Sequence, residues 1–277
     1  RRIFFVTPPR GSGTGIDVWS VELGKPIGTL WKNSDQESML RLVGNPARPR
    51  FAGLIEKLGA NDSRRQRIAV FDSDTLEVVT EFEVQDVVDL LFSPDGKSLL
   101  VESQPNVPTN QTENAKSTDP QRETMVTLFH ADSGRQLQKL NIAFTGDRTN
   151  AIGGRNTIVF RPDGQAIATL NTSGWSIDVW DLKTQTKVQA FKQTKQQQVQ
   201  FAWSLDGDRL ISMDAEGSTV AGGEMKVWDA ARGNALLVHS FSFFRPLQIV
   251  RLPGENRVFA YGWGPQPTIW DGRPIVD

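Results

Sequence analysis

The 277-residue sequence contains no cysteine, which excludes disulfide bonds, a thiolate nucleophile and a zinc-thiolate site. This absence favours a reducing compartment such as the cytoplasm, although a periplasmic protein can also lack cysteine. Histidine occurs only at His130 and His239, and neither has acidic or histidine neighbours at the spacing of metal ligands. We therefore expect no metal and no cofactor, and we interpret both histidines as structural.

Long apolar runs, excess charge and catalytic motifs are also missing. The longest apolar stretches span only a few residues, too few for a membrane-spanning helix. The formal net charge is −1, so neither nucleic acid nor an acidic membrane is an expected partner. The glycine-rich run Gly11–Gly15 lacks the Lys-Ser/Thr of a phosphate loop, and no G-x-S-x-G nucleophile motif occurs. We predict that the chain is not an enzyme and has no catalytic residues.

What the sequence does contain is a repeat: an apolar segment that ends in an aromatic residue and leads into a polar turn. The aromatic residues are separated by 52, 58, 51, 48 and 42 positions, and they are Trp19, Phe71, Phe129, Trp180, Trp228 and Trp270. Upstream of several of them lies a second turn, such as Ser93-Pro-Asp-Gly96, with an apolar strand on each side. Each repeat therefore predicts four short strands, with the aromatic ring packed in the core.

This order of strands, with S-P-D-G in the first turn and V-W-D before the last, resembles the WD-repeat family over nearly the whole chain. The resemblance implies an all-β fold: a β-propeller of about six four-stranded blades in a single domain, residues 1–277. The predicted blade segments are 1–33, 34–84, 85–142, 143–193, 194–242 and 243–277. The Gly-His pair and the buried Asp of that family are missing from most repeats, so the blades are of the divergent kind.

The two ends of the chain predict an incomplete ring. Residues 2–7 form the second strand of the first blade, so that blade lacks its innermost strand. Only residues 273–276 remain for the outer strand of the last blade. Either the ring has six blades with a short or open seam, or it is a fragment of a longer chain, which the start at Arg1-Arg2 favours. One insertion, residues 104–123, is polar and proline-rich and is predicted to be mobile.

The connections between strands divide into two faces. One face receives the acidic turns, and the other receives aromatic and basic residues in places where a turn is normally polar. The candidate partner-binding residues on this second face are Trp31, Arg64, Arg65, Arg67, Trp175, Phe243, Phe244, Arg245 and Trp263. Aromatic residues interleaved with arginine are typical of interaction hot spots. The alternatives are a solvated basic rim and aromatic rings that fold back to close the channel mouth or cover an adjoining blade.

The family resemblance implies a non-catalytic scaffold that binds a protein or peptide partner on one face of the propeller. A second hypothesis is an accessory propeller of a hydrolase or peptidase, or a small-molecule site in the channel, because S-P-D-G turns also occur in the propellers of TolB-like proteins and prolyl peptidases. A third is a structural subunit of a larger complex.

Overall fold

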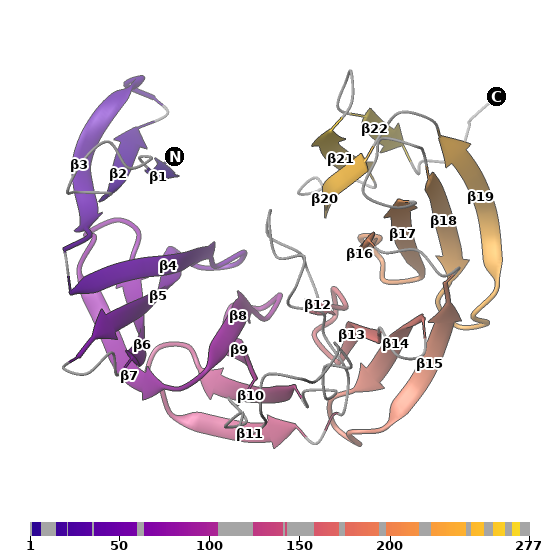
Figure 1. Ribbon diagram of the computed structural model, residues 1–277, viewed down its shortest axis with the longest axis horizontal. Coiled ribbons are helices and arrows are strands. Elements are labelled where there is room, and N and C mark those ends of the chain that lie inside the picture. The colour runs from indigo at the N-terminus through magenta and orange to yellow at the C-terminus, as the bar shows by residue number, and fades with distance from the viewer. Residues whose placement is uncertain are drawn as a thin grey trace, which may run out of the picture. The chain divides into compact units, whose positions relative to one another are not determined.

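The computed structural model describes residues 2–6, 15–20, 22–34, 36–59, 64–104, 124–140, 142, 158–171, 175–193, 198–215, 223–241, 245–251, 257–263 and 268–271. All regular structure in these ranges is β-strand, and the strands form six antiparallel sheets (Figure 1). The prediction of an all-β fold is confirmed for this part of the chain. Because these ranges include no helix, none in them is long and apolar enough to cross a bilayer.

The chain divides into two compact units, each with three of the sheets and its own hydrophobic clusters. Unit 1 comprises Arg1–Asn110 and Met125–Leu140, and unit 2 comprises Gln111–Thr124 and Asn141–Asp277.

Unit 1 holds sheets 1, 2 and 3. Sheet 1 consists of β1 (Arg2–Val6), β2 (Gly15–Ser20) and β3 (Lys25–Lys32). Sheet 2 consists of β4 (Glu37–Gly44), β5 (Arg50–Leu58), β6 (Arg64–Asp72) and β7 (Val78–Val84). Sheet 3 consists of β8 (Val87–Phe92), β9 (Ser98–Ser103), β10 (Met125–His130) and β11 (Gln136–Leu140).

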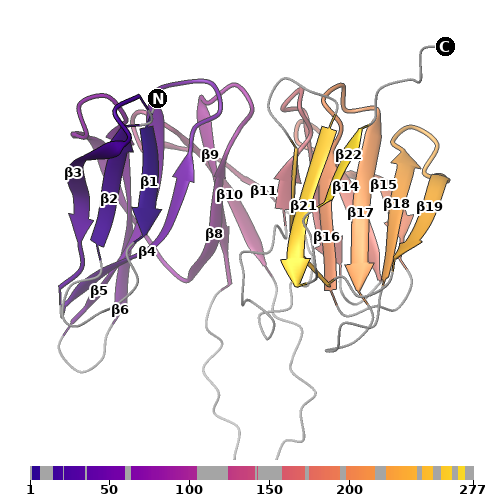
Figure 2. The same cartoon turned by 90° about the horizontal axis from the view of Figure 1, so that it is seen from above.

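Unit 2 holds sheets 4, 5 and 6. Sheet 4 consists of β12 (Ile158–Phe160), β13 (Ala166–Asn171), β14 (Ser176–Asp181) and β15 (Lys187–Lys192). Sheet 5 consists of β16 (Gln198–Trp203), β17 (Arg209–Ala215), β18 (Gly223–Asp229) and β19 (Ala235–Phe241), some of which Figure 2 shows side by side. Sheet 6 consists of β20 (Arg245–Arg251), β21 (Arg257–Trp263) and β22 (Thr268–Asp271).

Every sheet is an antiparallel meander in which strands adjacent in sequence are paired, and each sheet lies within one of the six predicted segments. In sheet 1, β1 pairs directly with the strand that carries Trp19, so within the described residues no strand lies beyond β1. Residues 273–276, predicted as the last outer strand, lie outside the described residues. Gln104, the first residue of the predicted insertion, is 2% exposed, and its N–H donates to the Asp86 carbonyl at 2.9 Å. The rest of the insertion lies outside the described residues.

The repeated aromatic residue occupies one place in the pairing register. It always lies opposite an apolar residue of the preceding strand, in the pairs Trp19–Ile3, Phe71–Phe51, Phe129–Leu99, Trp180–Ile167, Trp228–Leu210 and Trp270–Val258. In sheets 1 to 5 the register with the following strand shifts immediately before this residue. A bulge increases local twist, so the five sheets have the same distortion at the same point.

In sheets 3 and 5 the aromatic ring packs against the preceding sheet of the same unit. Phe129 of sheet 3 stacks on Phe82 of sheet 2, with ring centroids 4.8 Å apart. Trp228 of sheet 5 lies against Phe191 of sheet 4, with centroids 5.6 Å apart. Trp19 belongs to sheet 1, which no earlier sheet precedes, and it is 37% exposed. The expected core position is thus confirmed for Phe71 and Trp228, which are 3% and 6% exposed. Phe129 and Trp180 are half-buried, Trp19 is exposed, and nothing of the Trp270 side chain is described.

Candidate partner-binding edge

The predicted site residues lie at one end of each meander. We call this end the candidate edge. When β1 is counted as the second strand of its blade, the candidate edge is where a first strand begins, a second ends, a third begins and a fourth ends. Trp31 is near the end of β3, Arg64, Arg65 and Arg67 lie at the start of β6, and Trp175 directly precedes β14. Arg245 begins β20 and Trp263 ends β21, but nothing of either side chain is described. Phe243 and Phe244 lie outside the described residues.

In unit 1 the structure brings Trp31 and Arg67 together. The guanidinium carbon of Arg67 lies 5.8 Å from the centroid of the Trp31 ring, within cation–π range. Trp31 is half-buried, and its Nε1 is enclosed without a hydrogen-bond partner in the part of the chain that is described. Trp31 therefore belongs as much to the packing between sheets 1 and 2 as to a surface.

Glu37 of β4 anchors Arg67. Its two carboxylate oxygens accept hydrogen bonds from Arg67 Nη1 and Nη2 at 3.1 and 3.3 Å. The hydrogen bonds from Arg67 lower the pKa of Glu37, and the same contact raises the pKa of Arg67. Glu81 lies 3.5 Å from Arg67 Nε and Lys57 Nζ lies 3.7 Å from Glu37, which makes a four-residue ionic cluster.

The remaining arginines of this edge differ in their surroundings. Arg64 Nη1 lies 3.5 Å from Glu56 Oε2, but its side chain is largely exposed. Arg65 is exposed and lies opposite Lys57 in the β5–β6 register. The edge in unit 1 therefore carries both signs of charge. Sequence analysis missed the glutamates because they come from neighbouring strands; only the pairing of β5 with β6 could have indicated Glu56.

In unit 2 the candidate edge carries Trp175. Its side chain is 37% exposed, and its backbone has φ of 49°, in the left-handed region that bulky residues rarely adopt. The Trp175 carbonyl accepts a hydrogen bond from the Gln193 N–H at 2.7 Å, which ties this residue to the end of sheet 4. An exposed indole is thus kept at a backbone position where glycine would be less strained.

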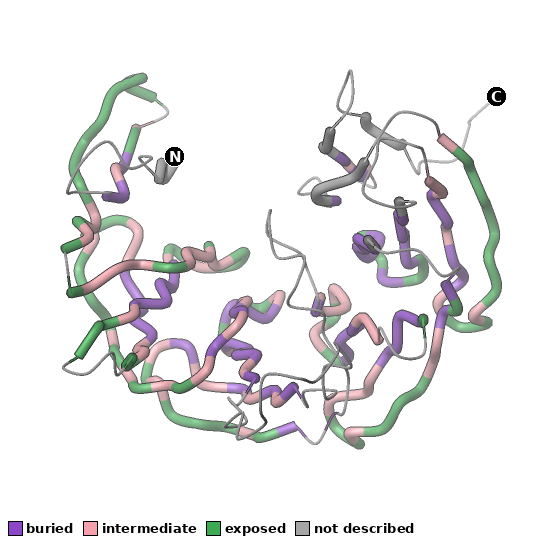
Figure 3. The backbone as a smooth tube through the Cα atoms, in the orientation of Figure 1, coloured by how far each residue is buried: buried purple, intermediate pink, exposed green. Residues whose placement is uncertain are grey.

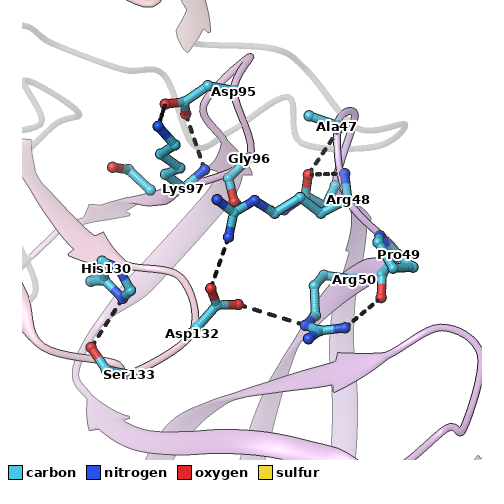
Figure 4. A network of polar contacts seen from close by, with 12 residues as sticks. Ala47, Arg48, Pro49, Arg50, Asp95, Gly96, Lys97, His130, Asp132 and Ser133 are labelled. Atoms are coloured by element: carbon cyan, nitrogen blue, oxygen red, sulfur yellow. Dashed lines mark hydrogen bonds and ion pairs between the residues drawn. The ribbon is translucent and has the colours of Figure 1, made fainter.

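The opposite edge carries the acidic turns, and arginines neutralise several of them (Figure 4). Arg48 Nη1 lies 2.9 Å from Asp132 Oδ2, and Arg50 Nε lies 3.6 Å from Asp132 Oδ1. Arg50 also pairs with Asp72. These contacts join the first turn of sheet 2 to the last turn of sheet 3. Both edges of unit 1 therefore mix charges, whereas the sequence predicted an acidic face and a basic face.

The turn aspartates are held by backbone donors. Oδ1 of Asp72, Asp181 and Asp229 accepts hydrogen bonds from the N–H groups two and three residues further on, at 2.7–3.0 Å. These donors stabilise the charged form and lower the pKa of all three carboxyls. The aspartate of the repeated mark is therefore a turn-forming residue in these sheets.

A polar pair that sequence analysis missed joins the first strands of sheets 2 and 3. Arg41 of β4 contacts Asp89 of β8, with Nε–Oδ1 at 2.8 Å and Nη2–Oδ2 at 3.1 Å. Burial raises the pKa of Asp89, and the charge of Arg41 opposes this effect. Nowhere in the described ranges do three or more His, Asp or Glu side chains gather as metal ligands would.

Comparison with known proteins adds no family to this description. No protein-family model matches the chain, and no curated protein matches it significantly in sequence.

Proposed function

We propose that the six sheets are the blades of a divergent, WD-repeat-like β-propeller, and that the protein is a non-catalytic scaffold that binds a protein or peptide at the candidate edge. Three repeated features support the propeller: consecutive antiparallel meanders, an aromatic residue at one register position, and a bulge just before it in five sheets. In a propeller the candidate edges of all blades share one face.

The observation that carries the binding proposal is Trp175. Tryptophan is enriched at binding hot spots, because its large aromatic side chain loses contact with water when a partner binds. Its left-handed backbone costs roughly 1–2 kcal/mol, but Leu76 and Gln185 share this conformation, so the exposed indole and not the strain carries the proposal. The cluster of Trp31, Arg67 and Glu37 supplies a second, pre-organised patch on the same kind of edge.

The experiment has two steps. A photoreactive phenylalanine analogue is placed at position 175, or at position 185 as the control, because Gln185 also has a left-handed backbone but lies on the opposite edge. Proteins crosslinked only from position 175 are the candidate partners. The affinity of each for the unmodified chain and for Trp175→Gly is then measured by calorimetry.

Trp175→Gly removes the indole and relieves the backbone. We expect it to weaken binding roughly thirtyfold, equivalent to about 2 kcal/mol, without lowering the free energy of unfolding. Gln185→Gly should bind as the unmodified chain does. Equal affinity of Trp175→Gly and the unmodified chain would contradict the proposal.

A second candidate function, a small-molecule site at the first strands of sheets 2 and 3, is favoured by one observation. Arg41 keeps 31% of its side chain exposed although Asp89 beside it is largely buried. An arginine held this way can receive an anionic group of a ligand. Protection of the Arg41 side chain from phenylglyoxal by small carboxylates or phosphates would support this site, and unchanged labelling would speak against it.

A further inference from the structure

The outer strand of sheet 5 is unusually apolar for an edge strand. β19 pairs with β18 and is the last strand in its sheet. Ala235 to Ser240 are all exposed, and three successive side chains, Leu236, Leu237 and Val238, are 48%, 50% and 51% exposed (Figure 3). The strand thus presents apolar side chains together with a row of outward backbone N–H and C=O groups.

The other described outer strands are protected in the usual way. Each carries at least one charged residue: Lys25 and Lys32 in β3, Glu81 and Glu83 in β7, Lys139 in β11, and Lys187 and Lys192 in β15. Such charges prevent another strand from pairing with an edge. The sequence of β19, Ala-Leu-Leu-Val-His-Ser-Phe, contains no Lys, Arg, Asp, Glu or Pro. Within one repeated architecture, only this described outer strand lacks the protection.

The size of this edge decides what can cover it. Seven residues span about 23 Å, and a sheet is about 10 Å thick, so the edge offers roughly 200–250 Å². A stable pair of globular proteins buries about 800 Å² on each partner, several times more. A short extended peptide matches the edge, because it gains its affinity from main-chain hydrogen bonds along a strand.

We propose that β19 is a docking strand for an extended, uncharged apolar peptide segment of another protein, which adds to sheet 5 as a fifth strand. This site is separate from the candidate edge, so it does not depend on the binding function proposed above. Charged residues in the segment would be disfavoured, because Leu237 and Val238 offer no counter-charge on β19.

The probe is a fluorescein-labelled, end-blocked heptapeptide, Thr-Val-Thr-Val-Thr-Val-Thr, titrated against the full chain and followed by fluorescence anisotropy. We expect saturable micromolar binding. The same peptide with alternate amides N-methylated should bind at least about tenfold more weakly, because it cannot form a ladder. Val238→Lys should cause a similar loss, whereas the matched control Val188→Lys, on the already charged β15, should leave binding unchanged.

Three results would overturn the proposal. The first is no binding of the probe at millimolar peptide, with circular dichroism showing a folded protein. The second is equal binding of the N-methylated peptide, which would mean contact without strand pairing. The third is self-association of the chain, seen by sedimentation and abolished by Val238→Lys, which would assign the strand to a second copy. None of these results depends on Trp175.

Discussion

At the scale of single residues, the repeats agree on backbone conformation more than on residue type. The turn between the third and fourth strands contains one left-handed residue in five sheets: Gly24, Leu76, Gly134, Gln185 and Gly233, with φ between 56° and 74°. Each donates its N–H to the carbonyl four residues earlier, at 2.8–3.0 Å. Glycine adopts this conformation without a steric penalty, whereas the side chains of Leu76 and Gln185 cause one.

We predict that Gln185→Gly stabilises the protein by about 0.5–1 kcal/mol, because relief of the left-handed strain exceeds the added freedom of the unfolded chain. The matched variant is Gly24→Ala, where no atom lies within 4 Å of the added Cβ, so only backbone strain changes. It should destabilise by about 1 kcal/mol. Urea unfolding measures both, and a loss of stability in Gln185→Gly would contradict the assignment of strain.

The residue scale also shows what sequence cannot supply. The turn aspartates were predictable, because Asp in a short polar segment after a strand is a turn former. The environment of Arg67 was not. Its partners Glu37 and Glu81 are 30 and 14 positions away in sequence, and they meet it only through the pairing of β4, β5, β6 and β7. Charge counted along a loop therefore overestimated how basic this edge is.

At the scale of elements, the hydrophobic and turn patterns predicted the strands well. Apolar residues alternate around each aromatic residue, and Asp or its substitute follows. This pattern determines the position and register of the aromatic-bearing strand in every sheet, because a shift of one residue would expose its buried side chains. The recurrent bulge before the aromatic residue was not predictable, because nothing in composition distinguishes a bulged from a regular position. Neither was the burial of Gln104, which continues sheet 3 beyond the end of β9.

The carboxylates that hold the turns lead to a prediction about how stability changes at low pH. A lowered pKa in the folded state gives a stabilisation that is complete above the ordinary aspartate value of 3.8 and is lost as pH falls through the folded value. We expect the urea midpoint to drop between pH 5 and pH 3, and to drop less in Asp181→Asn, which keeps the oxygen acceptor without the titration. The raised pKa of Asp89 changes the pH dependence of stability in the opposite direction, but it does so equally in the unmodified chain and in Asp181→Asn, so it cancels in this comparison. Parallel pH profiles would refute the role of Asp181.

At the scale of the whole molecule, the central claim is that the six sheets close into one propeller. Phe129 and Trp228 each pack against the sheet before their own, and a closed ring would give Trp19 of sheet 1 such a neighbour, namely sheet 6. Trp19 would then lose its exposure. The repeat predicted a ring of about six blades, but the chain ends predicted a short or open seam, so the position of Trp19 provides a test of whether the seam is closed.

Hydroxyl-radical footprinting with mass spectrometry tests this closure most directly, because Trp19 and Trp175 are both 37% exposed and have the same intrinsic reactivity. In the free protein, we predict that Trp19 is oxidised several times more slowly than Trp175, since the last blade covers the first in a ring while the candidate edge stays open. Equal oxidation rates of the two indoles would contradict a closed six-bladed propeller.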